Sequence, residues 1–420
     1  MQTATEHPHA AATPIGAAKT PRFGVNEMRL GVREWLATLA IVLACFVAIP
    51  RLWKKAEPLK TDADYRVPYA LSKDYWLFQR RLEQDVKGDK IAILGDSVVW
   101  GEYVRPDGTL SHFLNERYDS ANAPDDPPQG SPPDPAQIRP AVVSQNRFLN
   151  CGINGMFPLA MEGLVRDYAK VLHDRKVIVQ CNVLWMTSPK ADLSEDKEED
   201  FNHAALVPQF TLRIPSYRAD ANARLSAVIG RHVQFFQWAD HLQIAYYDQH
   251  SIPQWTLEDD GGDPPKYPNA WKNPLTPLRH GIPGEGAKDP LRGPSSPRHK
   301  PWNADGAEPT DFEWVDIDSS LQWQAFNRVV HLLKDRGNDV LVILGPFNEH
   351  MIADDQLAQY RKLHQTIIDR LTRDGFTVVA PPALPSSQYA DASHPLTAGY
   401  AMLARKIAED GAFNAWLAKK

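Results

Sequence analysis

The stretch Ile91-Ala92-Ile93-Leu94-Gly95-Asp96-Ser97 decides the fold that we predict for this chain. Four consecutive apolar residues ending at a glycine are typical of a short strand that is buried on both faces of a parallel sheet. Gly95-Asp96-Ser97 then places a serine just beyond the carboxyl end of that strand, where open α/β sheets bind their ligands. A motif of three residues also occurs by chance. Gly95-Asp96-Ser97 is informative because it directly follows a predicted buried strand.

The regular elements predicted for the rest of the chain alternate between strand and helix. Short apolar runs predict strands at residues 91–94, 142–149, 176–181, 340–344 and 377–380. Apolar residues at helical spacing predict helices at 69–86, 110–117, 161–173, 217–248, 321–336, 355–374 and 396–410. This alternation is typical of a parallel sheet covered by helices, so we expect an α/β fold.

Charge and cysteine content exclude some classes of function. The 420 residues carry a formal net charge of −6, which leaves no basic footprint for a nucleic acid. The three cysteines, Cys45, Cys151 and Cys181, have neither the spacing of metal ligands nor the density of a disulfide framework. We therefore expect no nucleic-acid partner and no metal site built on cysteine.

The N-terminal region predicts a membrane anchor. Residues 1–34 are rich in Ala, Thr and Pro and are expected to form a disordered tail. Residues 35–53 contain a single charge, Arg51, and at about 1.5 Å per residue they approach the ~30 Å of a bilayer core. Trp35 and Trp53 stand at the two ends of this run, as aromatic anchors do at membrane interfaces. A buried helix or a cleaved signal peptide fits these features less well.

Charge does not decide which way the anchor points, because basic residues flank it on both sides. A single N-terminal anchor usually leaves a short tail in the cytoplasm. We therefore expect a single-pass membrane protein with an extracytoplasmic domain, reached through a juxtamembrane segment at 54–88.

A Pro/Gly-rich insert at residues 255–310 divides the expected α/β domain into two parts, 89–254 and 311–420. A stretch this long without periodicity is either functional or disordered. Its tryptophans suggest two roles, stacking on sugar rings or packing a mobile lid. They are Trp255, Trp271 and Trp302.

A catalytic serine needs a base and a group that orients the base. A histidine held by a carboxylate meets both needs. Asp391-Ala392-Ser393-His394 supplies the pair in a loop after the last predicted strand, at the same edge of the sheet as Ser97. Asp200-Phe201-Asn202-His203 repeats the spacing, but it lies in an acidic run with no strand before it. We assign the second copy to a solvated surface.

Acyl transfer also requires donors that stabilise an oxyanion. Gly155, at a tight turn after a strand, can offer its backbone N–H, and Asn182, at the end of the next strand, can offer its side-chain amide. An ordinary turn glycine and a strand-end cap are the alternatives for these two residues. The segment Gly345-Pro346-Phe347-Asn348 also follows a strand, and it either lines the substrate pocket or forms a simple turn.

Four short blocks resemble the SGNH (GDSL-type) hydrolase family, in the family's order. They are GDSVVWGEYV at 95–104, NCGING at 150–155, QCNV at 180–183 and DASH at 391–394. The third block departs from the family pattern, because Cys181 and Val183 stand where Gly and Asp are more usual. The similarity covers about residues 90–182 and 316–415 and does not extend to the anchor or the insert.

The resemblance implies a flavodoxin-like three-layer α/β/α fold with a parallel sheet and no metal or organic cofactor. It implies Ser97 as the nucleophile, His394 as the base and Asp391 as its orienting carboxylate. The N–H groups of Ser97 and Gly155 and the amide of Asn182 would form the oxyanion hole.

Members of this family are mostly esterases, lipases and carbohydrate deacetylases, and membrane-anchored relatives assist O-acylation of cell-envelope polymers. The leading expectation is a membrane-anchored serine esterase that hydrolyses acyl or acetyl esters. The alternative is an O-acyltransferase or accessory for an envelope polysaccharide, with a membrane-bound acyltransferase as partner. A non-catalytic carbohydrate-binding module of the same fold is the contrasting class, and the intact serine, histidine and aspartate argue against it.

Overall fold

The structure is a computed structural model of the whole chain. It describes residues 31–57, 59, 73–86, 90–120, 147–193, 203–211, 214, 217–246 and 300–419. The chain forms two compact units, Met1–Ala48 and Ile49–Lys420. Residues 1–30 of the predicted tail lie outside the described residues. Most of the predicted insert, including Trp255 and Trp271, also lies outside them.

The second unit is built on a five-stranded sheet in which every pair of neighbouring strands is parallel. The strands are β1 (Ile91–Gly95), β2 (Phe148–Gly152), β3 (Lys176–Cys181), β4 (Asp339–Leu344) and β5 (Thr377–Val379), in the order β2-β1-β3-β4-β5. The chain therefore crosses from β2 over β1 to β3, so the sheet is extended in the opposite direction after β2. Such a switch point, between β1 and β3, opens a crevice at the carboxyl ends of the strands.

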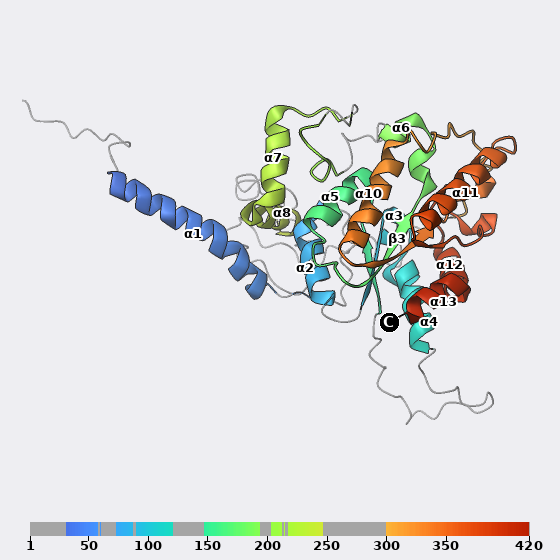
Figure 1. Ribbon diagram of the computed structural model, residues 1–420, viewed down its shortest axis with the longest axis horizontal. Helices are drawn as coiled ribbons and strands as arrows, with labels where there is room; N and C mark the ends of the chain where they lie inside the picture. Colours follow the sequence, from blue (N-terminus) through green and yellow to red (C-terminus); the bar gives the residue numbers. More distant parts are fainter. Residues whose placement is uncertain are drawn as a thin grey trace, which may run out of the picture. The chain divides into compact units, whose positions relative to one another are not determined.

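Helices cover both faces of this sheet (Figure 1). The longer helices of this unit are α2 (Tyr75–Asp85), α4 (Leu110–Ser120), α5 (Pro158–Asp167), α7 (Ala221–His232), α8 (Gln234–Tyr246), α10 (Leu321–Asp335), α11 (Leu357–Arg373), α12 (Thr397–Glu409) and α13 (Gly411–Ala418). Shorter turns of helix are α3 (Ser97–Trp100), η2 (Pro106–Gly108), η4 (Val183–Met186), α6 (Pro189–Leu193), η6 (Glu349–Met351) and η7 (Ser386–Gln388).

The apolar run of β1 is continuous because each face of the sheet has its own core. Ala92 and Leu94 belong to the core that includes side chains of α5, α10 and α11. Ile91 and Ile93 belong to the opposite core, with side chains of α4, α12 and α13. A strand with both faces buried needs no polar alternation, which is why the sequence showed four apolar residues in a row.

Three predicted elements differ from the structure. The helix expected at 161–173 is α5, which begins earlier, at Pro158, and ends at Asp167. The second strand was expected to end at residue 149, but β2 begins at Phe148 and continues through the polar residues to Gly152, because β1 pairs with it as far as Gly95. Residues 142–146 of the prediction lie outside the described part of the chain. The single helical region expected at 217–248 is two helices, which meet at Val233, where the backbone is extended.

The helix α1 (Val32–Ala56) contains the predicted anchor. It has 25 residues and a mean hydropathy of 2.1 over its most apolar window, so it is long and apolar enough to cross a membrane. Only 6% of that window is buried, so α1 is not a core helix. Apolar side chains such as Leu36, Ile41 and Leu43 are exposed along its length.

Candidate active site

Ser97 lies where β1 gives way to α3, at the carboxyl edge of the sheet. Asp96 turns the chain at this point, because its carboxylate caps α3 by accepting a hydrogen bond of 2.9 Å from the N–H of Val98. On the other side, the hydroxyl of Tyr400 in α12 donates a hydrogen bond of 2.8 Å to the carbonyl of Val98. Ser97 is therefore the buried first residue of a short helix whose second residue, Val98, is held through both its N–H and its carbonyl.

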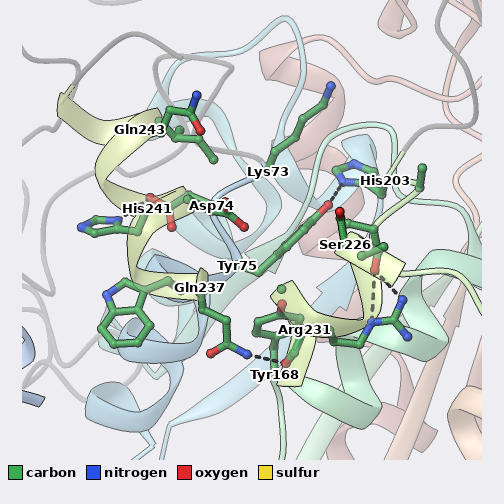
Figure 2. Close-up of a pocket in the computed structure, with 17 residues that line it drawn as sticks. Lys73, Asp74, Tyr75, Tyr168, His203, Ser226, Arg231, Gln237, His241 and Gln243 are labelled. Carbon is green, nitrogen blue, oxygen red and sulfur yellow. Dashed lines mark hydrogen bonds and ion pairs between the residues drawn. The ribbon is translucent and has the colours of Figure 1, made fainter. Parts of the chain in front are cut away.

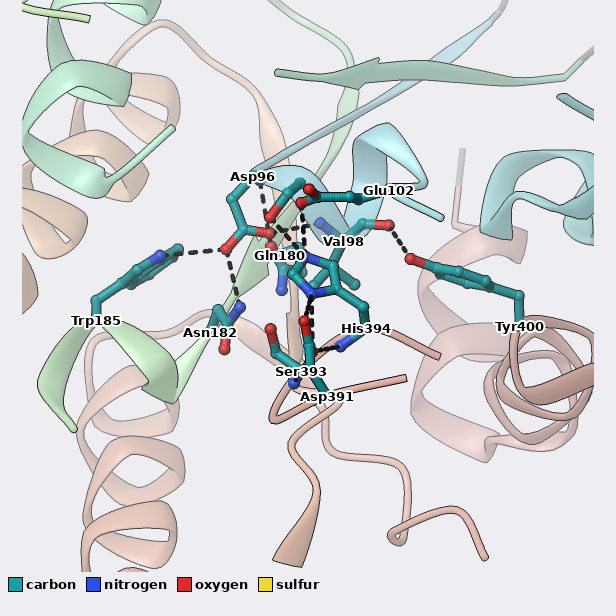
Figure 3. A network of polar contacts seen from close by, with 11 residues as sticks. Asp96, Val98, Glu102, Gln180, Asn182, Trp185, Asp391, Ser393, His394 and Tyr400 are labelled. Carbon is teal, nitrogen blue, oxygen red and sulfur yellow. Dashed lines mark hydrogen bonds and ion pairs between the residues drawn. The ribbon is translucent and has the colours of Figure 1, made fainter. Parts of the chain in front are cut away.

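Ser97, His394 and Asp391 form a continuous chain of hydrogen bonds, although about 300 residues separate the serine from the other two (Figure 3). The serine Oγ lies 2.7 Å from Nε2 of His394, and Nδ1 of His394 lies 2.7 Å from Oδ2 of Asp391. An ionised carboxylate only accepts hydrogen bonds, so the Nδ1 atom carries the proton. Nε2 is then left with a lone pair that can accept the proton of the serine hydroxyl.

The loop that carries His394 is held by its own aspartate. Oδ1 of Asp391 accepts hydrogen bonds of 2.9 Å from the N–H groups of Ser393 and His394. Asn348, which follows β4, donates from its backbone to the carbonyl of Ala392 and from its side chain to the carbonyl of Asp391. The spacing Asp-x-x-His thus lets one carboxylate fix both the turn and the imidazole.

Electrostatics at the site favour a histidine that gains a proton readily. Burial alone would lower the pKa of His394, but the hydrogen bond and charge of Asp391 outweigh it and raise that pKa above the ordinary histidine value. Burial would likewise raise the pKa of Asp391, but the hydrogen bonds that it accepts from His394 hold that pKa below its usual value. The pair is therefore arranged to stabilise an imidazolium beside a carboxylate.

Glu102 is a site residue that the sequence analysis missed. Its Oε2 atom lies 3.4 Å from Nε2 of His394 (Figure 3), the same nitrogen that is hydrogen-bonded to Ser97. The next residue, Tyr103, has a left-handed backbone with a φ of 68°, and its ring meets the imidazole edge-on. Both follow the serine within the first family-like block, so their proximity in sequence to Ser97 was the available signal.

Of the residues predicted for the oxyanion hole, Gly155 has a backbone conformation that suits a tight turn. It lies in the turn after β2 with a φ of 70°, a conformation that favours glycine. It is half-buried, and among the described residues none accepts a hydrogen bond from its N–H.

Asn182 is placed differently from a free donor. Its side-chain nitrogen donates a hydrogen bond of 2.9 Å to Oδ2 of Asp96, and its side-chain oxygen accepts one from the N–H of Leu184. The indole of Trp185 also donates to Oδ2 of Asp96 (Figure 3). Burial raises the pKa of Asp96, and these donated hydrogen bonds oppose that rise. Asn182 thus helps to hold the carboxylate of Asp96 in place. One hydrogen of its side-chain amide is used in the bond to Asp96, and the second hydrogen is not part of that bond.

The second Asp-x-x-His copy does not end on a solvated surface. Asp200 lies outside the described residues, but His203 is buried, and both ring nitrogens have hydrogen-bond partners. The expected surface position was wrong because a turn of the chain packs His203 between α2 and the turn after β2. The structure shows no contact between His203 and Ser97.

Two roles were expected for the segment after β4, lining a pocket or forming a simple turn. Phe347 and Asn348 are buried, with Phe347 packed on the rings of Trp314 and Tyr360. Asn348 supports the His394 loop through its two hydrogen bonds, and neither buried side chain faces an open pocket. Trp302, near the end of the predicted insert, donates through its indole to the hydroxyl of Ser386.

Comparison with known protein families finds no family model that matches the chain, and comparison with curated proteins finds no match either. Within the described ranges, no group of three or more His, Cys, Asp and Glu side chains could hold a metal ion.

Proposed function

We propose that this chain is a membrane-anchored serine esterase of the SGNH (GDSL-type) hydrolase family, acting on acyl or acetyl esters. The observation that carries the proposal is the hydrogen-bonded series from the Ser97 hydroxyl through His394 to Asp391, with 2.7 Å at each link. This is the geometry that activates a serine nucleophile, and such sites are recognised by geometry and roles.

The reaction follows from the placement of the protons. Oγ of Ser97 attacks the ester carbonyl while Nε2 of His394 takes its proton, and Asp391 stabilises the imidazolium that results. The N–H groups of Ser97 and Gly155 and the second amide hydrogen of Asn182 stabilise the oxyanion. His394 then donates its proton to the leaving alcohol, and a water molecule repeats the sequence to release the acid.

The strand order of the sheet is consistent with the proposed SGNH-type fold. The strand order β2-β1-β3-β4-β5 is the flavodoxin-like order, whose switch point lies between β1 and β3. Ser97 follows β1 and Asn182 follows β3, so both lie beside that point. The exposed apolar helix α1 supports a single-pass anchor, and we place the catalytic domain on the extracytoplasmic side.

A serine-directed fluorophosphonate tests the proposal on the full-length protein in detergent. We expect stoichiometric labelling at Ser97, no labelling of Ser97→Ala, and full labelling of Ser319→Ala, which removes an exposed serine outside the site. The labelled protein should lose p-nitrophenyl acetate hydrolysis. A wild-type protein that is folded but neither reacts nor hydrolyses the ester would refute the proposed function.

The same protein can be tested for the acceptor of the acyl group. With an acetylated polysaccharide as donor and an oligosaccharide as acceptor, an esterase releases free acetate in proportion to substrate consumed. Transfer of most acetyl groups to the oligosaccharide would contradict an esterase and indicate an O-acyltransferase.

A further inference from the structure

The buried histidine of the second Asp-x-x-His copy touches the peptide that presents Gly155. Nε2 of His203 lies 2.7 Å from the carbonyl oxygen of Asn154, and Nδ1 lies 2.7 Å from the hydroxyl of Tyr75 (Figure 2). A carbonyl only accepts, so Nε2 is the donor in the first bond. In a neutral ring Nδ1 is then the acceptor, and the hydroxyl of Tyr75 donates to it.

The protonation states of His203 and Tyr75 decide which atom donates in each of these two hydrogen bonds. Burial lowers the pKa of His203 to about 4, so the ring is neutral around pH 7. Burial also raises the pKa of Tyr75, so its hydroxyl stays protonated. The series therefore runs in one direction, from the Tyr75 hydroxyl to Nδ1, and from Nε2 to the carbonyl of Asn154.

The carbonyl of Asn154 and the N–H of Gly155 belong to the same peptide unit. That unit is planar, and in the trans form its C=O and N–H point in opposite directions. A hydrogen bond that fixes the carbonyl of Asn154 therefore also fixes the direction of the N–H of Gly155. This N–H has no acceptor within the described chain, and its direction decides whether it meets an oxyanion.

The turn that carries His203 is itself held firmly. The guanidinium of Arg231, in α7, donates to the carbonyls of Ala205 and Val207. On the other side the turn lies against Gly163 of α5, where an added Cβ would come within 1.9 Å of the carbonyl oxygen of Leu206. His203 itself has a left-handed backbone with a φ of 59°, which a non-glycine residue adopts at a cost. These contacts hold the turn, and with it the imidazole of His203, in place against the peptide of Asn154.

We propose that His203, oriented by Tyr75, is a positioning residue that aims the N–H of Gly155 as an oxyanion donor. The proposal rests on the esterase function proposed above. His203 touches no reacting atom, so its effect passes entirely through the peptide between Asn154 and Gly155. We call the series Tyr75–His203–Asn154 the carbonyl relay.

The test compares four variants of the full-length protein in detergent, using p-nitrophenyl acetate. His203→Leu removes the donor and should lower kcat by about 10- to 100-fold, since removing a whole oxyanion donor costs about 10²–10³-fold. KM should change by less than about threefold, because the donor acts on the oxyanion that develops in the transition state. His203→Gln, whose amide can donate to the same carbonyl, should recover kcat to within about fivefold of wild type.

Two further variants separate the relay from general effects on the fold. Tyr75→Phe removes only the hydroxyl that orients the ring and should lower kcat several-fold, by less than His203→Leu. Ser226→Ala is the matched control, because Ser226 lines the same cavity of about 390 Å³ as Tyr75 and His203 (Figure 2) and has no role in the relay. Ser226→Ala should have the wild-type kcat.

The reaction rate with fluorophosphonate gives a second measure, because the phosphonyl oxygen takes the position of the oxyanion. This rate should fall in parallel with kcat across the variants. A folded His203→Leu protein with wild-type kcat would overturn the relay and leave the esterase intact, and so would a His203→Gln protein as slow as His203→Leu. A wild-type protein without esterase activity would overturn both proposals.

Discussion

In the proposed mechanism Ser97 and His394 act as one unit, so removing either should lower activity nearly as much as removing both. We expect Ser97→Ala and His394→Ala each to lower kcat for p-nitrophenyl acetate by about three orders of magnitude or more. His112→Ala is a suitable control, because His112 lies on α4 beside Glu116, away from the site. A His394→Ala protein that keeps more than a tenth of wild-type kcat would contradict its assignment as the base.

Glu102 adds a negative charge beside the same imidazole and should tune its titration. The charge of Glu102 acts with that of Asp391 to raise the pKa of His394 against the effect of burial. The base must be neutral to accept the serine proton, so activity falls as pH drops through that pKa. Glu102→Gln removes one stabilising charge from the imidazolium, and the acidic limb of kcat/KM should therefore move to lower pH.

A pH–rate profile of wild type and Glu102→Gln measures this shift directly. Glu116→Gln, on the exposed face of α4, should leave the limb in place. A shift of the Glu102→Gln limb to higher pH would mean that Glu102 does not stabilise the charged ring.

The sequence predicted the triad residues and missed those that support them, for a physical reason. The carboxyl ends of parallel strands meet at one edge, so residues after separate strands can be brought together by topology alone. Ser97, Asp391 and His394 are of this kind. The contacts of Asn348 with the His394 loop and of His203 with Asn154 depend on how loops pack, which spacing along the chain does not determine.

Among the elements, β3 has the bounds that the sequence predicted, Lys176–Cys181, and its residues from Val177 onward are buried. The polar end of β2 was not predictable from propensity, since its hydrogen bonds depend on β1 lying beside it. Asn115 of α4 also fixes β2, by exchanging hydrogen bonds with the backbone of Phe148. Tertiary pairing therefore decided the boundary that the sequence left open.

The helices α2 and α8 are joined by a buried charged cluster around His241. Nδ1 of His241 lies 2.7 Å from Asp74, which caps α2, and Nε2 lies 2.9 Å from Glu57. Arg80 of α2 pairs with the same glutamate. Burial would lower the pKa of His241, but the two carboxylates outweigh it and raise that pKa to about 9.

This shift predicts how stability depends on pH. A histidine whose pKa is raised on folding contributes stability that is fully present below its unfolded pKa of ~6.5 and is lost as pH rises through its folded pKa. The melting temperature should therefore decrease between about pH 6.5 and pH 9. His241→Gln should lower the melting temperature at pH 6 and flatten this decrease. An equally steep decrease in His241→Gln would show that other groups cause it.

At the scale of the whole molecule, the anchor and its orientation can be tested together. Full-length protein should sediment with membranes and resist carbonate extraction. For orientation, Cys45→Ser leaves two buried thiols, Cys151 and Cys181, whose pKa burial raises, so neither should react with an impermeant thiol reagent. In that background Ser319→Cys, at an exposed position, should react in intact cells. Protection of this cysteine until the cells are lysed would place the domain in the cytoplasm.

The buried cluster around His241 also bears on where a stable form of the proposed catalytic domain begins, because the cluster extends back to Glu57. A chain starting at Pro58 removes the apolar run, but it also removes Glu57, one residue beyond the end of α1. Glu57 is buried with its carboxylate between His241 and Arg80, so its loss leaves two cationic groups without their shared partner. Breaking a buried ion pair from one side costs about 3–5 kcal/mol.

We therefore expect a chain that starts at Ile49, the first residue of the second compact unit, to be more stable than one that starts at Pro58. The measurement is the melting temperature of both at pH 7, with Glu57→Gln in the longer chain as the matched control. The control should resemble the shorter chain in stability, and all three should react with fluorophosphonate when folded, because Ser97 does not depend on Glu57. Equal melting temperatures for the two lengths would mean that the buried cluster adds no net stability.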